Sequence, residues 1–130
     1  DMAAELRVPN EYKNLIYARS RLVHAGASVG VDVIDVPYLD LEDMDGMKKE
    51  AELVRDLGFT GKGSIHPKQI NMLNEIFTPS KEEIIKAKRI VDQFNESDTG
   101  LVVIDGKLIE KPVLREMQRK ILIADKINQS

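Results

Sequence analysis

The chain has 130 residues, of which 42% are apolar and 32% charged, as is typical of a globular domain with a real core. It contains no cysteine, which excludes disulfides, thiol nucleophiles and cysteine metal sites and is compatible with a cytoplasmic location. A net charge of −3 without a basic stripe argues against nucleic-acid binding. Since no apolar run approaches the roughly 20 residues that span a bilayer, we expect no membrane partner either.

The first part of the chain predicts a helix followed by a strand. Residues 10–28 place apolar side chains at helical spacing, and Gly30 then provides a stop signal. Residues 31–38 form a short β-branched run, and Pro37 is expected to mark the end of that strand because proline cannot donate to a sheet.

The same order of elements continues. Residues 47–58 predict a second helix that ends at a C-cap glycine, and residues 62–65 predict a brief second strand. Residues 66–77 predict a helix with Pro67 in its first turn. Strands that are separated by helices pair in parallel through crossovers. The arrangement indicates an α/β fold and the tail of a larger α/β repeat, with a barrel as the favoured form.

The last part of the chain has a different character. Ser80 and Glu83 have the spacing of a capping box, and an apolar stripe of helical period follows them. Residues 96–100 predict a turn. Residues 101–110 predict a β-hairpin, because the dipeptide "DG" at their centre suits a two-residue type I′ turn. Residues 111–128 predict a final amphipathic helix.

The segment "GFTGKGSIHPKQI" is a candidate ligand-binding loop. Gly61 and Gly63 let the backbone approach a ligand closely, and Pro67 starts a helix whose N-terminus attracts anions. Lys62 and Lys68 add positive charge, and late loops of barrels often bind phosphate. The alternative is a glycine turn and a proline cap with the lysines in solvent. Spacing alone favours this structural interpretation.

Three other features have more than one interpretation. Asp35 lies inside an apolar strand, so its carboxylate is either hydrogen-bonded structure or part of a site at the strand's C-terminal end. For Arg19 and Arg21 on the first predicted helix, a solvated or salt-bridged role is the default. The acidic residues 40–45 resemble a calcium loop, but Leu41 occupies the first ligand position, which favours a solvated loop before a helix.

Several motifs together resemble one family. The segment "GFTGKGSIHPKQI" is similar to the family pattern "GFxGKxxIHPxQI", and "FTPS" follows it as in the family. Upstream, "LIYARSRLV" and "VIDVPYLD" are similar to "LLYARxxIV" and "AIDxVYxD". Near the end, "GKLIEKPVL" resembles "GxMIDxPVL". The chain thus resembles the citrate lyase beta subunit and its relatives, the HpcH/HpaI aldolases that include malyl-CoA and citramalyl-CoA lyases.

The resemblance implies a (β/α)8 TIM barrel with a C-terminal extension. Residues 1–77 would be the last βα units of the barrel, and residues 78–130 would be the extension of helix, hairpin and helix. The opening "DMAAEL" is similar to the end of the family's metal-binding motif "GxEDxxAxL". Asp1 would then be a magnesium ligand, and the chain would begin inside that motif, with the metal-binding glutamate and a substrate-binding arginine upstream.

The resemblance also implies an activity. It is a magnesium-dependent carbon–carbon lyase that cleaves a citryl, citramalyl or malyl thioester of CoA or an acyl carrier into an oxo acid and an acyl thioester. Glu110, where the family usually has aspartate, would be the catalytic acid or base and would act in trans in a homo-oligomer, a trimer or hexamer. Lys62, Gly63, Ser64 and Asp35 would bind the thioester.

A function of another class stays open beside the enzyme. The chain would then be a non-catalytic thioester-binding and subunit-interaction fragment of a larger assembly with other lyase subunits. Glu110 and the missing upstream half favour this alternative for the chain taken alone. A complete barrel with the metal-binding glutamate in the parent reading frame would favour the enzyme.

Overall fold

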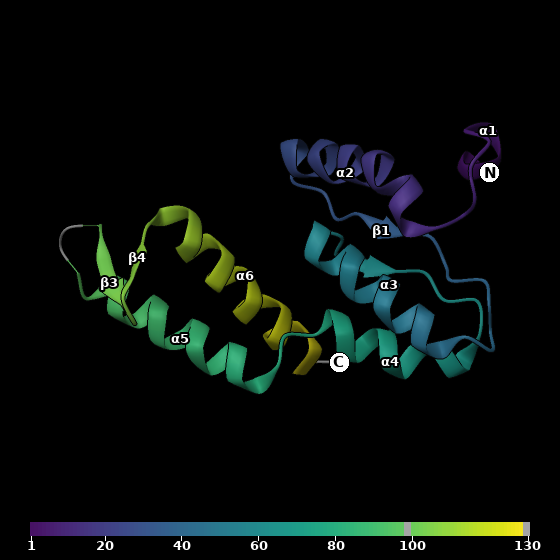
Figure 1. Ribbon diagram of the computed structural model, residues 1–130. Coiled ribbons are helices and arrows are strands. Elements are labelled where there is room, and N and C mark those ends of the chain that lie inside the picture. Colours follow the sequence, from purple (N-terminus) through teal and green to yellow (C-terminus); the bar gives the residue numbers. More distant parts are fainter. Residues whose placement is uncertain (98–99, 129–130) are drawn as a thin grey trace. The chain divides into compact units, whose positions relative to one another are not determined.

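The computed structural model describes residues 1–97 and 100–128 (Figure 1). The chain forms two compact units, Asp1–Phe77 and Thr78–Ser130, and each is described by itself. The turn expected over residues 96–100 includes Asp98 and Thr99, which lie outside the described residues.

The first unit is an α/β arrangement around a two-stranded parallel sheet. Ile34 of β1 pairs with Gly61 of β2, and Asp35 pairs with Lys62. The predicted parallel pairing is therefore confirmed, with a helix as the crossover between the strands. The elements in chain order are α1 (Met2–Glu5), α2 (Tyr12–Val29), β1 (Ile34–Asp35), α3 (Met44–Leu57), β2 (Gly61–Lys62) and α4 (Pro67–Phe77).

Local signals set the helix ends. Gly30 and Gly58 cap α2 and α3 with φ angles of 71° and 114°, a left-handed conformation that favours glycine, so both predicted stops are confirmed. Helix α3 begins at Met44, earlier than predicted, because the Asp43 side chain accepts a hydrogen bond of 2.8 Å from the Gly46 amide. The acidic residues 40–45 thus form a loop and a helix start, as the favoured interpretation expected.

The first strand is shorter than the predicted residues 31–38. Only Ile34–Asp35 is paired as a strand, because β2 offers only two residues for pairing. Two backbone hydrogen bonds of 2.9 Å flank the pair, from the Thr60 amide to the Val33 carbonyl and from the Gly63 amide to the Asp35 carbonyl. Within the described residues this sheet has no third strand, so the rest of the β-branched run has nothing to pair with.

The apolar core of the first unit lies between α3 and α4, which run side by side in Figure 1. The helix predicted over residues 10–28 is confirmed as α2, but apolar side chains that indicated it, such as Ile16 and Leu22, are exposed. The buried residues of α2 are Arg19 and Gly26, because this face supplies an ion-pair partner to the sheet. The buried members of the core are Met47, Ala51, Leu73 and Ile76.

The second unit is a helix, a hairpin and a helix: α5 (Lys81–Asn95), β3 (Val102–Ile104), β4 (Lys107–Ile109) and α6 (Lys111–Asn128). The Ser80 hydroxyl accepts a hydrogen bond of 3.2 Å from the Glu83 amide, and the Glu83 carboxylate accepts one of 2.9 Å from the Ser80 amide. The predicted capping box is therefore confirmed. Helices α5 and α6 pack against each other (Figure 1).

The hairpin of the second unit is also confirmed. Asp105 and Gly106 have φ angles of 51° and 73°, and a type I′ turn requires a positive φ at both central residues. Ile104 and Ile109 are buried against residues of α5, while Val103 and Leu108 on the other face are exposed. The buried cluster of this unit consists of Ile90, Phe94, Ile104 and Ile109.

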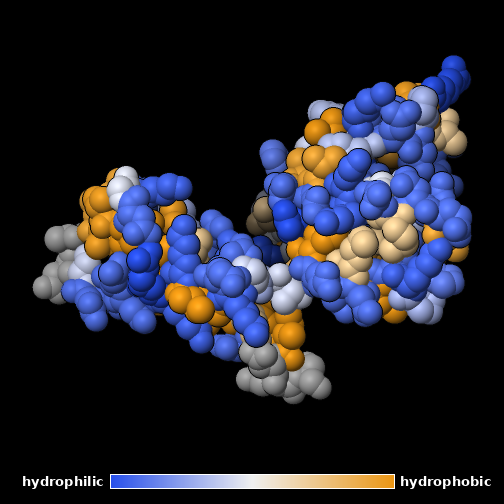
Figure 2. Space-filling model, turned by 60° about the horizontal axis from the view of Figure 1, so that its bottom comes forward, coloured by the Kyte–Doolittle hydropathy of each residue, from blue (hydrophilic) through white to orange (hydrophobic). Residues whose placement is uncertain are grey.

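Both units leave large apolar side chains at the surface. Ile34 of β1 is 61% exposed, Leu39 is 68% exposed and Val29 is 71% exposed. Figure 2 shows hydrophobic residues gathered in patches on the face that it draws. None of the helices in the described part of the chain combines the length and the apolar character that a membrane span requires.

These surfaces predict that the 130 residues alone do not form a stable monomer. Open sheet edges and apolar patches favour association or aggregation. We expect size-exclusion chromatography of the isolated chain to show oligomers or aggregates. A sharp, cooperative thermal unfolding transition of a purified monomer would contradict this prediction.

Candidate functional site

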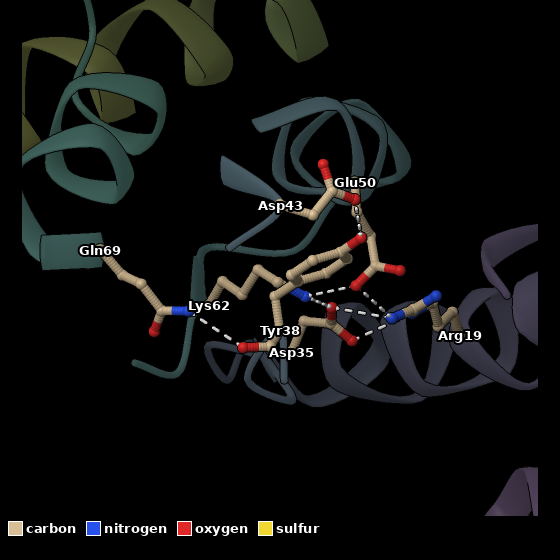
Figure 3. Close-up of polar contacts among 7 residues, drawn as sticks. All are labelled: Arg19, Asp35, Tyr38, Asp43, Glu50, Lys62 and Gln69. Atoms are coloured by element: carbon tan, nitrogen blue, oxygen red, sulfur yellow. Dashed lines mark hydrogen bonds and ion pairs between the residues drawn. The ribbon is translucent and has the colours of Figure 1, made fainter. Parts of the chain in front are cut away.

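A buried ion network joins the two strands to two helices (Figure 3). The Arg19 guanidinium donates to both oxygens of Asp35, each at 3.0 Å, and to Glu50 at 3.2 Å. The Lys62 ammonium lies 2.7 Å from Asp35 and 2.7 Å from Glu50. The Lys62 side chain is 0% exposed and that of Asp35 is 4% exposed. Two cations and two anions thus neutralise one another between α2, α3 and the sheet.

The charges in this network are held by their partners. Burial by itself raises the pKa of the Asp35 carboxyl, but hydrogen bonds and charge from Arg19 and Lys62 outweigh it and hold that pKa below its usual value. Arg19 also lies over the Tyr12 ring, with 5.4 Å between the guanidinium carbon and the ring centroid. Its Nη1 is the one buried side-chain nitrogen or oxygen without a partner in the described part of the chain.

The position of Lys62 and Asp35 differs from what a ligand-binding role needs. The sequence left the Asp35 carboxylate open between hydrogen-bonded structure and a site, and the structure shows the hydrogen bonds. Contact of the Lys62 ammonium with a phosphate would require breaking buried ion pairs. That these two residues bind the thioester stays a prediction. Sequence alone gave Glu50 no role, because it lies on α3 among other acidic residues.

Two loops begin at the strand ends that this network holds, because Asp35 is the last residue of β1 and Lys62 the last residue of β2. Residues 36–43 follow β1, and Gly63 to His66 follow β2. In open and closed parallel sheets, ligands bind outside the carboxyl ends of the strands. The Gly63 amide donates a hydrogen bond to the Asp35 carbonyl. A Cβ on Gly63 would lie 3.1 Å from Pro37 Cγ. Glycine therefore lets the second loop approach the first, and Ser64 beside it is exposed.

The first loop contains a contact that the sequence analysis missed. The Tyr38 hydroxyl donates a hydrogen bond of 2.7 Å to Asp43, and this bond raises the pKa of Tyr38 to about 12. In return, hydrogen bonds from Tyr38 and from the Gly46 amide hold the pKa of Asp43 below its usual value. The Asp43 carboxylate thus both caps α3 and orients the tyrosine. The spacing "YLDLED" was the available signal for a tyrosine and a helix cap on one loop.

The other two predicted site residues lie at separate places. Asp1 is exposed and precedes the short helix α1 in the first unit, and Glu110 is exposed and precedes α6 in the second unit. The described residues contain no group of three or more His, Cys, Asp or Glu side chains that would hold a metal ion. Asp1 offers one carboxylate, and carboxylate oxygens are suitable ligands for magnesium. The roles of both residues stay predictions.

Comparison with known proteins identifies the family. The family model described as HpcH/HpaI aldolase/citrate lyase matches residues 1–67. The chain belongs to this family. It is 30% identical to citrate lyase subunit beta of Leuconostoc mesenteroides subsp. cremoris over 87% of its own length and 38% of that protein, and 32% identical to mitochondrial citramalyl-CoA lyase of Rattus norvegicus over 90% and 36%. The resemblance inferred from the motifs is therefore confirmed.

A solved structure supports the same assignment. The protein CitE from Mycobacterium tuberculosis, solved with magnesium, acetoacetate and coenzyme A, superposes with a TM-score of 0.72 at 27% identity. The match covers 84% of this chain and 40% of CitE. The chain thus has an α/β fold of the citrate lyase kind and spans about two fifths of the length of its relatives.

We predict that the ion network stabilises the fold through Lys62. Lys62→Met should lower the free energy of unfolding by about 3–5 kcal/mol, because Arg19 alone would then face the carboxylates of both Asp35 and Glu50, which leaves an uncompensated negative charge in the network. Lys68→Met is a matched control, since Lys68 makes an exposed pair of 3.3 Å with Glu42 and exposed pairs contribute about 1 kcal/mol or less. Urea unfolding of the intact protein measures both. Equal effects of the two substitutions would contradict the prediction.

The network also predicts a loss of stability in acid. Because the pKa of Asp35 is lower in the folded protein than in the unfolded chain, where it is near 3.8, its contribution is fully present above that value. The contribution is lost as the pH falls through the folded pKa. Urea midpoints between pH 7 and pH 3 should therefore fall less for Asp35→Asn than for the unchanged protein. Parallel curves for the two proteins would refute this role of Asp35.

Proposed function

We propose that the chain is part of a magnesium-dependent carbon–carbon lyase that cleaves a 3-hydroxy-acyl thioester into an oxo acid and an acyl thioester. The family match is the observation that carries this proposal, with relatives named citrate lyase subunit beta and citramalyl-CoA lyase. The complex of CitE with magnesium, acetoacetate and coenzyme A supports the cofactor and the carrier. CoA or an acyl-carrier protein would hold the acyl group.

We place the first unit at the end of a (β/α)8 barrel. The side of β1 that holds Asp35 faces helices α2 and α3, while Ile34 on the other side is 61% exposed. This is the arrangement expected of a barrel strand, whose outer side is covered by helices and whose inner side needs the remaining strands. The second unit would be the C-terminal extension of that barrel.

In the proposed reaction this chain contributes a proton-transferring group. The bond between the thioester α-carbon and the hydroxyl-bearing carbon breaks, and the electron pair remains on the thioester as an enolate. The hydroxyl proton passes to water, from which the Glu110 carboxylate regains a proton after each turnover. The Glu110 carboxyl would give its proton to the enolate carbon. Asp1 would donate one carboxylate ligand to magnesium, which supplies Lewis-acid chemistry when bound.

The loop after β2 would hold the carrier arm of the thioester. Ser64 is exposed at the carboxyl end of β2, and Gly63 keeps its loop close to Pro37. Lys62 and Asp35 would hold the start of this loop in place through the ion network. Glu110 would reach the loop in trans, from the extension of a neighbouring subunit in a homo-oligomer such as a trimer or hexamer.

Assays of the intact protein test the activity. Citramalyl-CoA, malyl-CoA and citryl thioesters should be offered separately, with magnesium, and the oxo acid released should be measured. Cleavage of one of these thioesters supports the proposal. Binding of the thioesters without cleavage would instead favour the non-catalytic, subunit-interaction alternative.

We predict that Glu110→Gln lowers kcat of the intact protein by about 10²–10⁴-fold, the usual contribution of a positioned proton-transferring group. Glu116→Gln is the matched control, because Glu116 is an exposed glutamate of α6 that pairs with Lys120. Steady-state kinetics should show full activity for this control. Full activity of Glu110→Gln would remove the assignment.

We also predict that the site is shared between subunits. Mixing Glu110→Gln subunits with Asp1→Asn subunits should recover part of the activity, because some interfaces then regain both carboxylates. Glu110→Asp, which restores the residue usual in the family, should keep or raise kcat. The trans arrangement would be refuted by a mixture that assembles normally and stays inactive.

A further inference from the structure

The side chain of Gln69 connects the loops that follow the two parallel strands. Figure 3 shows its bond to Tyr38 in the loop after β1. Gln69 lies near the start of α4 and is only 1% exposed, although its side chain is polar. A buried amide is costly unless its polar atoms are paired, so the contacts of this side chain carry information about its role.

The amide of Gln69 binds one loop with its nitrogen and the other with its oxygen. Its Nε2 donates a hydrogen bond of 3.0 Å to the Tyr38 carbonyl in the loop after β1. Its Oε1 accepts hydrogen bonds from the Ile65 amide at 3.0 Å and from the Ser64 hydroxyl at 3.2 Å, both in the loop after β2. Because a carbonyl needs a donor and an amide needs an acceptor, these partners also fix which amide atom faces which loop.

The loop after β1 that Gln69 binds is itself held firmly. The Tyr38 side chain is bound to Asp43, and Asp43 caps α3. The loop after β2 approaches it so closely that a Cβ on Gly63 would lie 3.1 Å from Pro37 Cγ. Gln69 therefore links the exposed segment around Ser64 to the loop after β1, whose conformation is held by Asp43. Its role is more than filling space in the core.

We propose that Gln69 is a positioning residue for binding of the thioester's carrier arm. It holds the backbone from Gly63 to Ile65 in one conformation before the ligand arrives, so that binding does not have to order the loop. Preorganisation of this kind improves affinity by reducing the entropy lost on binding. The inference rests on the proposed function and assigns a residue to the thioester site of that function.

Binding of coenzyme A to the intact protein tests the proposal. Gln69→Met keeps the length of the side chain and removes the amide, so it should raise the Kd for coenzyme A by about tenfold or more. Gln69→Glu, measured at pH 8, keeps the acceptor for Ile65 and Ser64 but loses the donor to Tyr38, so its Kd should lie between those of Gln69→Met and the unchanged protein. Isothermal titration calorimetry measures both values.

Leu73→Ala is the matched control for general destabilisation. Leu73 is buried one turn further along α4 in the apolar core, and its side chain has no polar atom that could bind the backbone of either loop. This variant should lower the melting temperature at least as much as Gln69→Met and keep the Kd of the unchanged protein. In steady-state assays Gln69→Met should raise KM for the thioester more than it lowers kcat.

Each outcome decides the proposal. An unchanged Kd in Gln69→Met overturns the positioning role, and an unchanged Kd in Gln69→Glu overturns the link to Tyr38. A loss of affinity in Leu73→Ala equal to that in Gln69→Met would show that destabilisation alone explains the effect, which also overturns it. Failure of the unchanged protein to bind coenzyme A, its thioesters and acyl-carrier thioesters alike refutes the proposed function itself, and the inference with it.

Discussion

The carboxylate of Asp35 is the constraint on which the first unit depends. It lies on a strand with 4% of its side chain exposed, so it must be neutralised and hydrogen-bonded where it lies. Arg19 from α2 and Lys62 from β2 meet this need, and Glu50 from α3 balances their charge. Two helices and two strands are thereby fixed around one acidic side chain.

The ion network determines where the loops after β1 and β2 begin. Lys62 ends β2, and the next residues turn into the loop that contains Gly63 and Ser64. Asp35 ends β1, and the next residues form the loop that contains Tyr38. Because the ends of both strands are held by buried charges, the two loops start from fixed points, and Gln69 then joins them. A ligand-binding surface formed by these two loops would therefore be held rigidly by the strand ends and by Gln69.

The partial extent of the chain explains several of its features. It covers 38% of the citrate lyase beta relative from Leuconostoc mesenteroides subsp. cremoris. A two-stranded parallel sheet with an exposed Ile34 needs further strands to cover its open side. The proposed catalytic residues, Asp1 and Glu110, lie in different units.

The sequence by itself determined the family and the elements other than the short helix α1, which it did not predict. Some features depend only on residues within a few positions of one another, and such short-range interactions can be predicted from the sequence. Examples are the capping box of Ser80 and Glu83 and the turn at Asp105 and Gly106. The family motifs were legible for the same reason. The length of β1 was not, because a strand exists only where a partner strand offers hydrogen bonds. Only the tertiary structure decided that Lys62 is buried and that Gln69 reaches the loop after β1. The partners of Lys62 and the Tyr38 carbonyl bound by Gln69 lie 12 to 31 positions away in the chain and meet these residues only after folding.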